Sequence, residues 1–280
     1  AARTGWEFSY VLMAALMIAG VAAALFAAEP SSDATAVATS SCSDQPAFMS
    51  WTPRKLYDAV VGPFVVFFTE HGNKALLLLV AISLYRLPDF IMGPMVNPFY
   101  QDLGLSNDAI GAMRAGVGLW ATIAGVAAAG FCVVRLGFVK TLIIGAFLAP
   151  ASNLGLTFMA TQGPDLWAFA AVLTLENFSE GFSGTALIAW MSSLTTFGYA
   201  ATQYALLSSF YTILGKLLKG LSGVAVSELE QVFGLIPAYG VFFACTAAVG
   251  IPSILVVIWA GRAHAHSMAS YKNIGDSPTT

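Results

Sequence analysis

The sequence predicts an all-α integral membrane protein, and two observations support this fold class. Of the 280 residues, 58% are hydrophobic and only 10% are charged, whereas soluble domains carry about 25% charged residues. The apolar residues also gather in long segments. Each segment has about the 20 residues that a helix needs to cross the hydrocarbon core of a bilayer. A protein whose helices cross the membrane several times is therefore expected.

Seven segments are expected to be transmembrane helices. They are residues 8–28, 75–97, 109–134, 139–160, 166–194, 201–224 and 235–260. A cleaved signal peptide is the alternative for the first segment. Its apolar run is long for such a peptide, and Glu7 weakens the positively charged start that signal peptides have.

The order of these segments predicts four regions. Residues 1–28 form a single span, 29–74 a cytoplasmic linker with a possible amphipathic helix, 75–262 a six-helix bundle, and 263–280 a cytoplasmic tail. Major-facilitator carriers contain two six-span halves joined by a cytoplasmic linker. The pattern therefore fits the last span of one half followed by the whole second half, and the start at Ala1 suggests a fragment or a processed product.

The basic residues predict the orientation of the spans, because cytoplasmic loops carry an excess of Lys and Arg. With the linker in the cytoplasm, most basic residues in loops lie on that side. They are Arg54, Lys55, Lys74, Arg135, Lys140, Arg262 and Lys272. Lys216 and Lys219 fit the rule poorly, because they fall near the outer end of the sixth span.

Ionisable residues inside the apolar spans are the candidate functional residues. Glu176 and Glu180 lie one helical turn apart in the fifth span. A carboxylate is costly to place in a bilayer and usually marks a pathway for an ion, a proton or a substrate. Asp89 and Arg114 are expected at a similar depth in neighbouring spans, where they can form an ion pair. Arg86, one turn before Asp89, is expected to reach Glu176.

Two interpretations of these charges remain open. The charges form a network that binds a proton or an anionic substrate and changes partners during transport, or they form fixed pairs that hold the helices together. Glu180 fits a solvated position in the cytoplasmic vestibule. Asn177 is expected to hydrogen-bond across helices. Gln203, near the cytoplasmic end of its span, fits an interfacial position equally well.

Prolines distinguish the second span from the others. Pro88, Pro94 and Pro98 are expected to kink or break this helix. Interrupted helices often line the substrate site of a carrier, so this span is the expected wall of a cavity. The many glycines of the other spans are expected mainly to let helices approach closely.

No enzyme, cofactor or metal site is expected. Residues 181–184 match the G-x-S-G pattern of rhomboid-type intramembrane proteases. Such a serine needs a base, and the three histidines, His71, His264 and His266, lie outside the expected spans. The motifs of zinc proteases, nucleotide-binding loops and thiol pairs are also missing from the sequence. No basic block is present, which argues against nucleic acid as a partner.

Several runs of the sequence resemble the AmpG-type muropeptide permeases of the major facilitator superfamily. The resemblance covers about residues 55 to 262, the carboxyl-terminal half of the family's usual length. The runs are YRLPD at 85–89, GLWATI at 118–123, ASNLG at 151–155, ENF at 176–178, GTA at 184–186 and ATQYALLSS at 201–209.

The resemblance implies a twelve-span, proton-driven symporter of a bacterial inner membrane. Its substrates would be anhydromuropeptides, which are N-acetylglucosamine–anhydro-N-acetylmuramic acid peptides released and recycled during turnover of the peptidoglycan wall. By position, the resemblance makes Asp89, Glu176, Asn177 and Gln203 the candidate coupling and substrate residues. It also implies an amino-terminal six-helix half as a partner.

The sequence departs from the family pattern at three positions. Pro88 replaces a usual glycine, Arg114 stands where lysine is common, and Lys216 stands where arginine is common. Two alternatives to this carrier stay open. One is a major-facilitator carrier of another substrate, such as acetyl-CoA or small peptides, and the other is a truncated membrane protein that does not transport.

Overall fold

The computed structural model describes residues 6–26, 62, 65–69, 72, 74–195 and 200–275, with side chains described as far as Ala260. It separates into two units, residues 1–50 and 51–280. Every secondary-structure element in the described ranges is a helix, which confirms the all-α prediction. The predicted linker falls almost entirely outside these ranges.

The first unit contains one described helix, α1 (Trp6–Phe26). At about 1.5 Å per residue its 21 residues extend for about 32 Å. The helix covers most of the predicted span 8–28, and its last two residues lie outside the description. The described side chains of α1 are almost all exposed within this unit.

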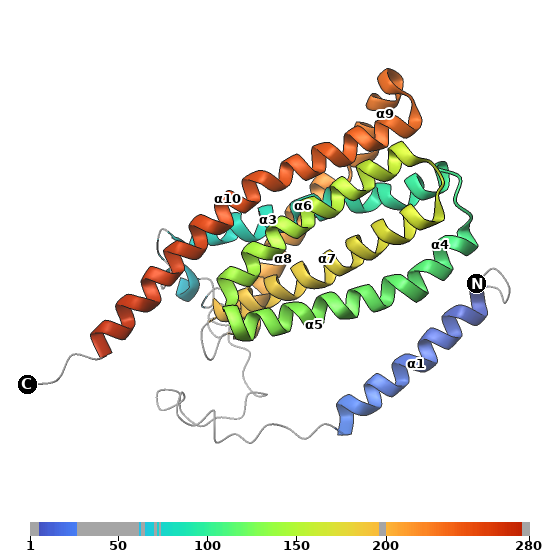
Figure 1. Ribbon diagram of the computed structural model, residues 1–280. Coiled ribbons are helices and arrows are strands. Elements are labelled where there is room, and N and C mark those ends of the chain that lie inside the picture. The colour runs from blue at the N-terminus through green and yellow to red at the C-terminus, as the bar shows by residue number, and fades with distance from the viewer. Residues whose placement is uncertain are drawn as a thin grey trace, which may run out of the picture. The chain divides into compact units, whose positions relative to one another are not determined.

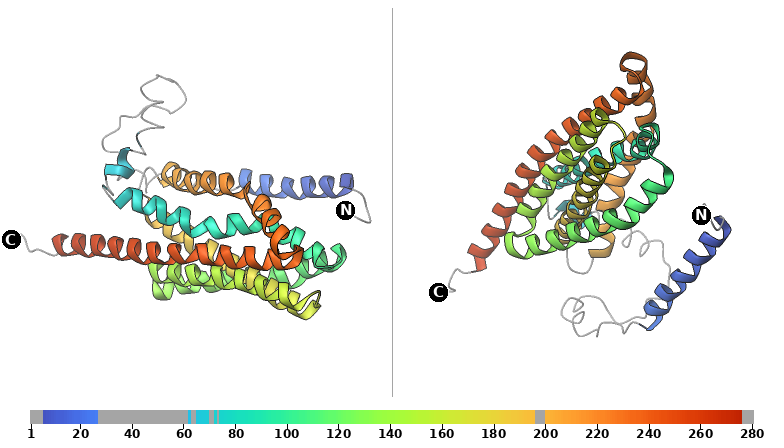
Figure 2. Two further views of the ribbon diagram at one scale, coloured as in Figure 1. Left: turned by 90° about the horizontal axis from the view of Figure 1, so that it is seen from above. Right: turned by 45° about the vertical axis from the view of Figure 1, so that its right-hand side comes forward.

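The second unit is a helical bundle (Figure 1). Its elements are α3 (Lys74–Asp102), α4 (Asn107–Met113), the π-helix η2 (Arg114–Gly118), α5 (Leu119–Leu136), α6 (Phe138–Gln162), α7 (Leu166–Ser193), α8 (Ala200–Lys219), α9 (Ser222–Phe233) and α10 (Leu235–Gly275). Within this unit, α6 packs against α7 and α10, α7 also packs against α5, and α3 packs against α8 and α10. Figure 2 shows these long helices running lengthwise beside one another.

Four helical segments among the described residues are long and apolar enough to cross a membrane. They are Lys74–Asp102, Asn107–Leu136, Phe138–Gln162 and Leu235–Ala260. Helix α7 has 28 residues, and its two glutamates lower its mean hydropathy. Helix α8 has 20 residues and carries two lysines in its last turn. The total of seven spans and the four-region division stay predictions.

Two separate apolar cores hold the bundle together. The first contains the start of α3, the start of α6 and the end of α7, with Trp190 fully buried among them. The second contains the end of α3, the end of α6 and the start of α7, with Phe99 fully buried. Between these cores lies a layer of polar side chains. On α6 and α10, Asn153 donates a hydrogen bond of 3.2 Å to the hydroxyl of Thr246 in this layer.

Glycines bring α5 and α7 into backbone contact. This agrees with the prediction that glycines in the spans let helices approach closely. A Cβ atom on Gly181 would lie 2.5 Å from the carbonyl oxygen of Thr122. A Cβ atom on Gly125 would overlap the carbonyl oxygen of Phe178 and lie 3.0 Å from the backbone nitrogen of Phe182. Neither helix can move away from the other without losing this contact, so both positions require glycine.

Two helices differ from their predicted course. The predicted span 201–224 is wrong at its end, because α8 stops at Lys219 and α9 starts at Ser222. The Ser222 hydroxyl lies 2.9 Å from the Lys219 carbonyl oxygen and 2.8 Å from the Ile91 carbonyl oxygen on α3, which fixes the turn. Lys216 and Lys219 lie in the last turn of α8, where cations stabilise the helix dipole.

Helix α3 continues without a break over Pro88, Pro94 and Pro98. The sequence predicts that these prolines kink or break this helix; the break is wrong, the kink stays a prediction, and α3 does form a cavity wall, as described below. The backbone of α10 also stays helical past residue 262, where the predicted bundle ends, as far as Gly275.

Candidate functional site

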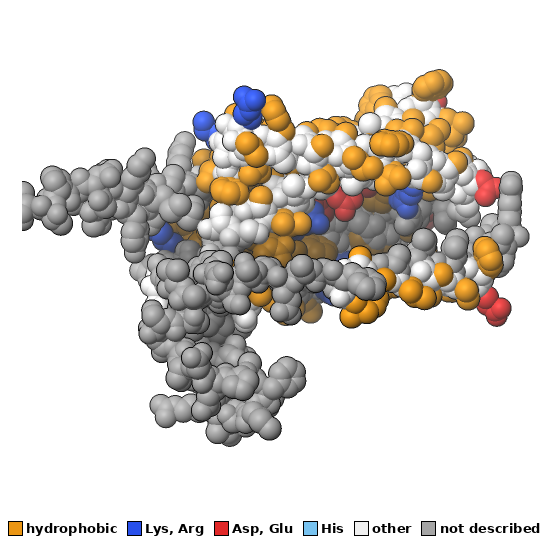
Figure 3. Space-filling view, turned by 90° about the horizontal axis from the view of Figure 1, so that it is seen from below, with side chains coloured by type: hydrophobic (Ala, Val, Ile, Leu, Met, Phe, Trp, Pro, Cys, Tyr) orange, Lys and Arg blue, Asp and Glu red, His pale blue; other side chains and the backbone are white. Residues whose placement is uncertain are grey.

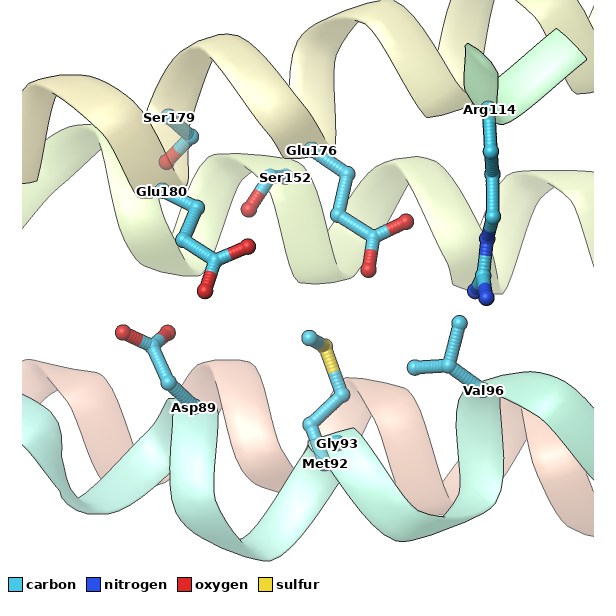
Figure 4. A pocket seen from close by; sticks show the side chains of 9 residues that line it. All are labelled: Asp89, Met92, Gly93, Val96, Arg114, Ser152, Glu176, Ser179 and Glu180. Carbon is cyan, nitrogen blue, oxygen red and sulfur yellow. The ribbon is translucent and has the colours of Figure 1, made fainter. Parts of the chain in front are cut away.

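A cavity of about 200 Å³ lies in the polar layer between the two apolar cores. Helices α3, α6 and α7 and the π-helix η2 form its walls (Figure 4). The lining residues are Asp89, Met92, Gly93, Val96, Arg114, Ser152, Glu176, Ser179 and Glu180. Acidic and basic side chains also lie close together among hydrophobic ones in the space-filling view of Figure 3. Four of the seven predicted site residues thus line one cavity.

Asp89 forms its ion pair within α3. Its carboxylate oxygen Oδ2 accepts a hydrogen bond of 2.9 Å from Nη1 of Arg86, and the two side chains are 23% and 21% exposed. The predicted pairing of Asp89 with Arg114, and that of Arg86 with Glu176, are therefore both wrong. Residues three apart on a helix are neighbours on one face, so Arg86 reaches Asp89 more readily than a partner on another helix.

The helix bounds explain where Arg114 lies instead. Helix α3 runs to Asp102, five residues beyond the predicted end at 97, and the chain returns in α4 from Asn107. Arg114 consequently lies level with Val96, about 10 Å further along α3 than Asp89 at 1.5 Å per residue. The two charges occupy opposite ends of the cavity.

Tyr100 connects Arg114 with Glu176, and sequence reasoning missed it. Its hydroxyl donates a hydrogen bond of 2.8 Å to Oε2 of Glu176. The guanidinium carbon of Arg114 lies 5.8 Å from the centre of its ring, a cation–π contact. Helical spacing provides a signal that could have found it, because Tyr100 follows Asp89 by 11 residues, or three turns of α3. Both residues therefore lie on the face of α3 that lines the cavity.

Glu180 lies across the cavity from Asp89, and their carboxylates point toward each other in Figure 4. The side chain is exposed within the described part of the chain, and its solvated position stays a prediction. Glu176 and Glu180 project from the same face of α7, one turn apart. Two carboxylates of α7 and one of α3 thus share a single polar space.

The two predicted amide residues lie outside the cavity lining. Asn177 accepts a hydrogen bond of 3.3 Å from the Thr122 hydroxyl and donates one of 2.8 Å to the Leu173 carbonyl oxygen. The predicted bond across helices is therefore confirmed. Gln203 is fully buried in α8, three residues from the start of the helix, and its interfacial position stays a prediction.

Replacing Tyr100 with phenylalanine tests the link to Glu176. Tyr100→Phe keeps the ring that Arg114 covers and removes the hydroxyl. The expected loss is about 1 kcal/mol of unfolding free energy, because the carboxylate loses a donor but still borders an open cavity. Thermal unfolding of the purified protein in detergent measures this loss.

Tyr239→Phe serves as the comparison. It removes a hydrogen bond of 2.7 Å to Asp102, a carboxylate that is exposed at the end of α3. The loss in this variant is expected to be smaller, because water can replace the donor. A Tyr100→Phe protein as stable as the wild type would contradict the assigned role of the hydroxyl.

The fold and the cavity define a class of protein. Ionisable side chains midway along apolar helices mark pathways for ions, protons or polar substrates across membranes. The chain is a multi-pass, all-α membrane protein with the architecture of a transporter.

The relatives of the chain agree with this class. The chain is 29% identical over 255 residues to the anhydromuropeptide permease of Escherichia coli (strain K12), covering 91% of this chain and 47% of the permease. It is 28% identical over 204 residues to "Putative transporter AmpG 4" of Rickettsia felis, covering 73% of this chain and 47% of that protein. It is 27% identical over 218 residues to "Putative transporter AmpG 3" of Rickettsia prowazekii, covering 78% and 50%.

These similarities confirm the predicted resemblance to AmpG-type permeases, and they support a major-facilitator-type fold. The relatives are named as permeases or transporters rather than enzymes. No family model matches the chain. The chain spans about half the length of the relatives that it matches.

Proposed function

We propose that this chain forms the carboxyl-terminal half of a proton-coupled importer of anhydromuropeptides. The cavity carries the proposal, because Asp89, Glu176 and Glu180 line one polar space between two apolar cores. The similarity to an anhydromuropeptide permease supports this substrate class. An inner-membrane location and a role in peptidoglycan recycling belong to the same proposal.

Proton coupling follows from the partners of the carboxylates. Protonation of Asp89 removes the charge that holds Arg86, and protonation of Glu176 changes its hydrogen bond with Tyr100. Each event alters the contacts of α3, which forms one wall of the cavity. Binding of a proton is thereby linked to movement of that wall and to loading of the substrate.

The proposal also requires an amino-terminal half, which would complete the cavity. The described cavity is open on one side, and Arg114 and Glu180 are both exposed in the chain alone. An amino-terminal six-helix half would provide the opposite wall, as in other carriers with two halves. This chain by itself is therefore not expected to transport.

Uptake measurements test the proposed function. Membrane vesicles containing the complete protein are given an inward proton gradient and a radiolabelled N-acetylglucosamine–anhydro-N-acetylmuramic acid tripeptide. Accumulation is expected with the gradient and is expected to disappear when a protonophore collapses it. Equal uptake with and without the gradient would overturn proton coupling, and no uptake above empty vesicles would overturn the substrate assignment and favour a membrane protein that does not transport.

The alternative substrate acetyl-CoA is less compatible with the cavity. Three carboxylates and one guanidinium line it among the described residues. The phosphate groups of CoA carry more negative charge than the peptide of a glycopeptide, so three nearby carboxylates would repel CoA more strongly. Competition of the labelled glycopeptide with acetyl-CoA and with a small peptide measures this preference directly.

A further inference from the structure

Arg114 provides hydrogen-bond donors that the described part of the chain leaves open. Its guanidinium points into the cavity in Figure 4 and carries five N–H donors. Its contact among the described residues is with the face of the Tyr100 ring. A ring face accepts no conventional hydrogen bond, so these donors remain available to a bound molecule.

Among the described residues, no carboxylate of the cavity forms an ion pair with Arg114, although Glu176 lies near enough to interact with its charge. Asp89 is paired with Arg86, and Glu180 faces Asp89 at the same end. Glu176 accepts its hydrogen bond from Tyr100, whose ring is the surface that Arg114 contacts. One end of the cavity therefore holds Asp89 and Glu180, the other holds Arg114, and Glu176 lies between them.

The local backbone also distinguishes Arg114. It begins the π-helix η2, in which the helix between α4 and α5 widens for five residues. Single π-turns inside α-helices are rare and occur frequently at functional sites. The wider turn offsets the register of α4 from that of α5, which is fixed against α7 by Gly125. The direction of Arg114 is thus set separately from the packing of α5.

We propose that Arg114 forms the subsite that binds a carboxylate of the transported substrate. A guanidinium binds a carboxylate through two parallel hydrogen bonds, which gives both affinity and orientation. The proposal rests on the proposed function for the substrate, since a glycopeptide carries carboxylates on its peptide. It predicts that the peptide end of the substrate lies at the Arg114 end of the cavity and the sugars lie elsewhere.

Binding of a matched ligand pair tests this subsite without any proton gradient. The ligands are the disaccharide tripeptide with free carboxylates and the same compound with every carboxylate amidated. Their Kd values are measured from ligand-induced thermal stabilisation of the complete protein in detergent. The free acid is expected to bind the wild type at least about tenfold more tightly than the amide. Arg114→Gln is expected to weaken binding of the acid by about 10- to 100-fold and to leave binding of the amide unchanged.

Two further variants make the test specific. Arg114→Lys keeps the charge but loses the planar fork, so its Kd for the acid is expected between those of the wild type and Arg114→Gln. Arg135→Gln is the matched control, because Arg135 also covers an aromatic ring, Phe131 at 5.3 Å, but lies at the end of α5 outside the cavity lining. This control is expected to bind both ligands as the wild type does.

The possible outcomes separate this proposal from the proposed function. If Arg114→Gln weakens both ligands equally, or neither, the carboxylate subsite is wrong while the muropeptide assignment stands. If neither ligand stabilises the wild type, the substrate assignment and the subsite both fail. The subsite is supported if Arg114→Gln loses the preference for the free acid while Arg135→Gln keeps it. This outcome does not depend on what the uptake experiment shows about protons.

Discussion

Glu176→Gln is expected to abolish proton-driven accumulation while leaving exchange of substrate intact. Glutamine has nearly the shape of a protonated glutamic acid but cannot release a proton. The variant should therefore move substrate in both directions without using the gradient. A pH difference of one unit corresponds to about 1.4 kcal/mol for one proton, so it supports about tenfold accumulation in the wild type. The variant is expected to reach a concentration ratio of about one.

Two transport assays on the same vesicles distinguish coupling from transport itself. Net uptake is measured with an imposed pH gradient, and exchange is measured with unlabelled substrate inside and labelled substrate outside. Asp89→Asn is expected to lose accumulation in the same way, with an additional loss of stability because Arg86 loses its partner.

Glu228→Gln provides the control, since Glu228 is exposed on α9 and lies outside the cavity lining. It is expected to accumulate substrate as the wild type does. Unchanged gradient-dependent accumulation in both Glu176→Gln and Asp89→Asn would rule out these carboxylates as the coupling groups.

Gly181→Ala is expected to destabilise the bundle by about 1–3 kcal/mol, the usual cost of forcing an extra methyl group into a packed interior. The added Cβ would meet the backbone carbonyl of Thr122 at 2.5 Å. Backbone cannot move aside as a flexible side chain can, so α5 and α7 would have to separate. Gly125→Ala is expected to act similarly, because its Cβ would overlap the carbonyl oxygen of Phe178.

Matched glycines on the same helices give the controls. Gly184 on α7 and Gly130 on α5 have no atom within 4 Å of an added Cβ. Alanine favours a helix over glycine by up to about 1 kcal/mol, so Gly184→Ala and Gly130→Ala are expected to keep or raise stability. Unfolding in detergent, followed by tryptophan fluorescence, measures all four proteins. A Gly181→Ala protein more stable than Gly184→Ala would show that the close approach of α5 and α7 is not required.

Composition and hydropathy predict most of the helices, because long apolar segments have few alternatives in a membrane. The predicted span 166–194 matches α7 almost residue for residue. The break between α8 and α9 could not be predicted in this way, because Leu221 and Val224 continue the apolar pattern past the turn. A single hydroxyl contact from Ser222 to another helix fixes that turn, and such a contact depends on the tertiary structure.

The candidate site was likewise predictable from the sequence only in part. A carboxylate in an apolar span is visible in the sequence, and Asp89, Glu176 and Glu180 do line one cavity. Their partners depend on where the neighbouring helices begin and end, and an error of five residues at the end of α3 placed Arg114 opposite Asp89. Tyr100 was missed for the same reason, because the predicted span ended at 97 and left it outside the helix.

The separation of the two apolar cores bears on leakage across the membrane. The buried side chains of the core around Trp190 and those of the core around Phe99 have no member in common. Because they share no side chain, repacking of one core would not by itself disturb the contacts of the other. In a carrier of the kind proposed above, closing the two ends of the cavity would therefore fall to different sets of side chains, and no single set would have to seal both.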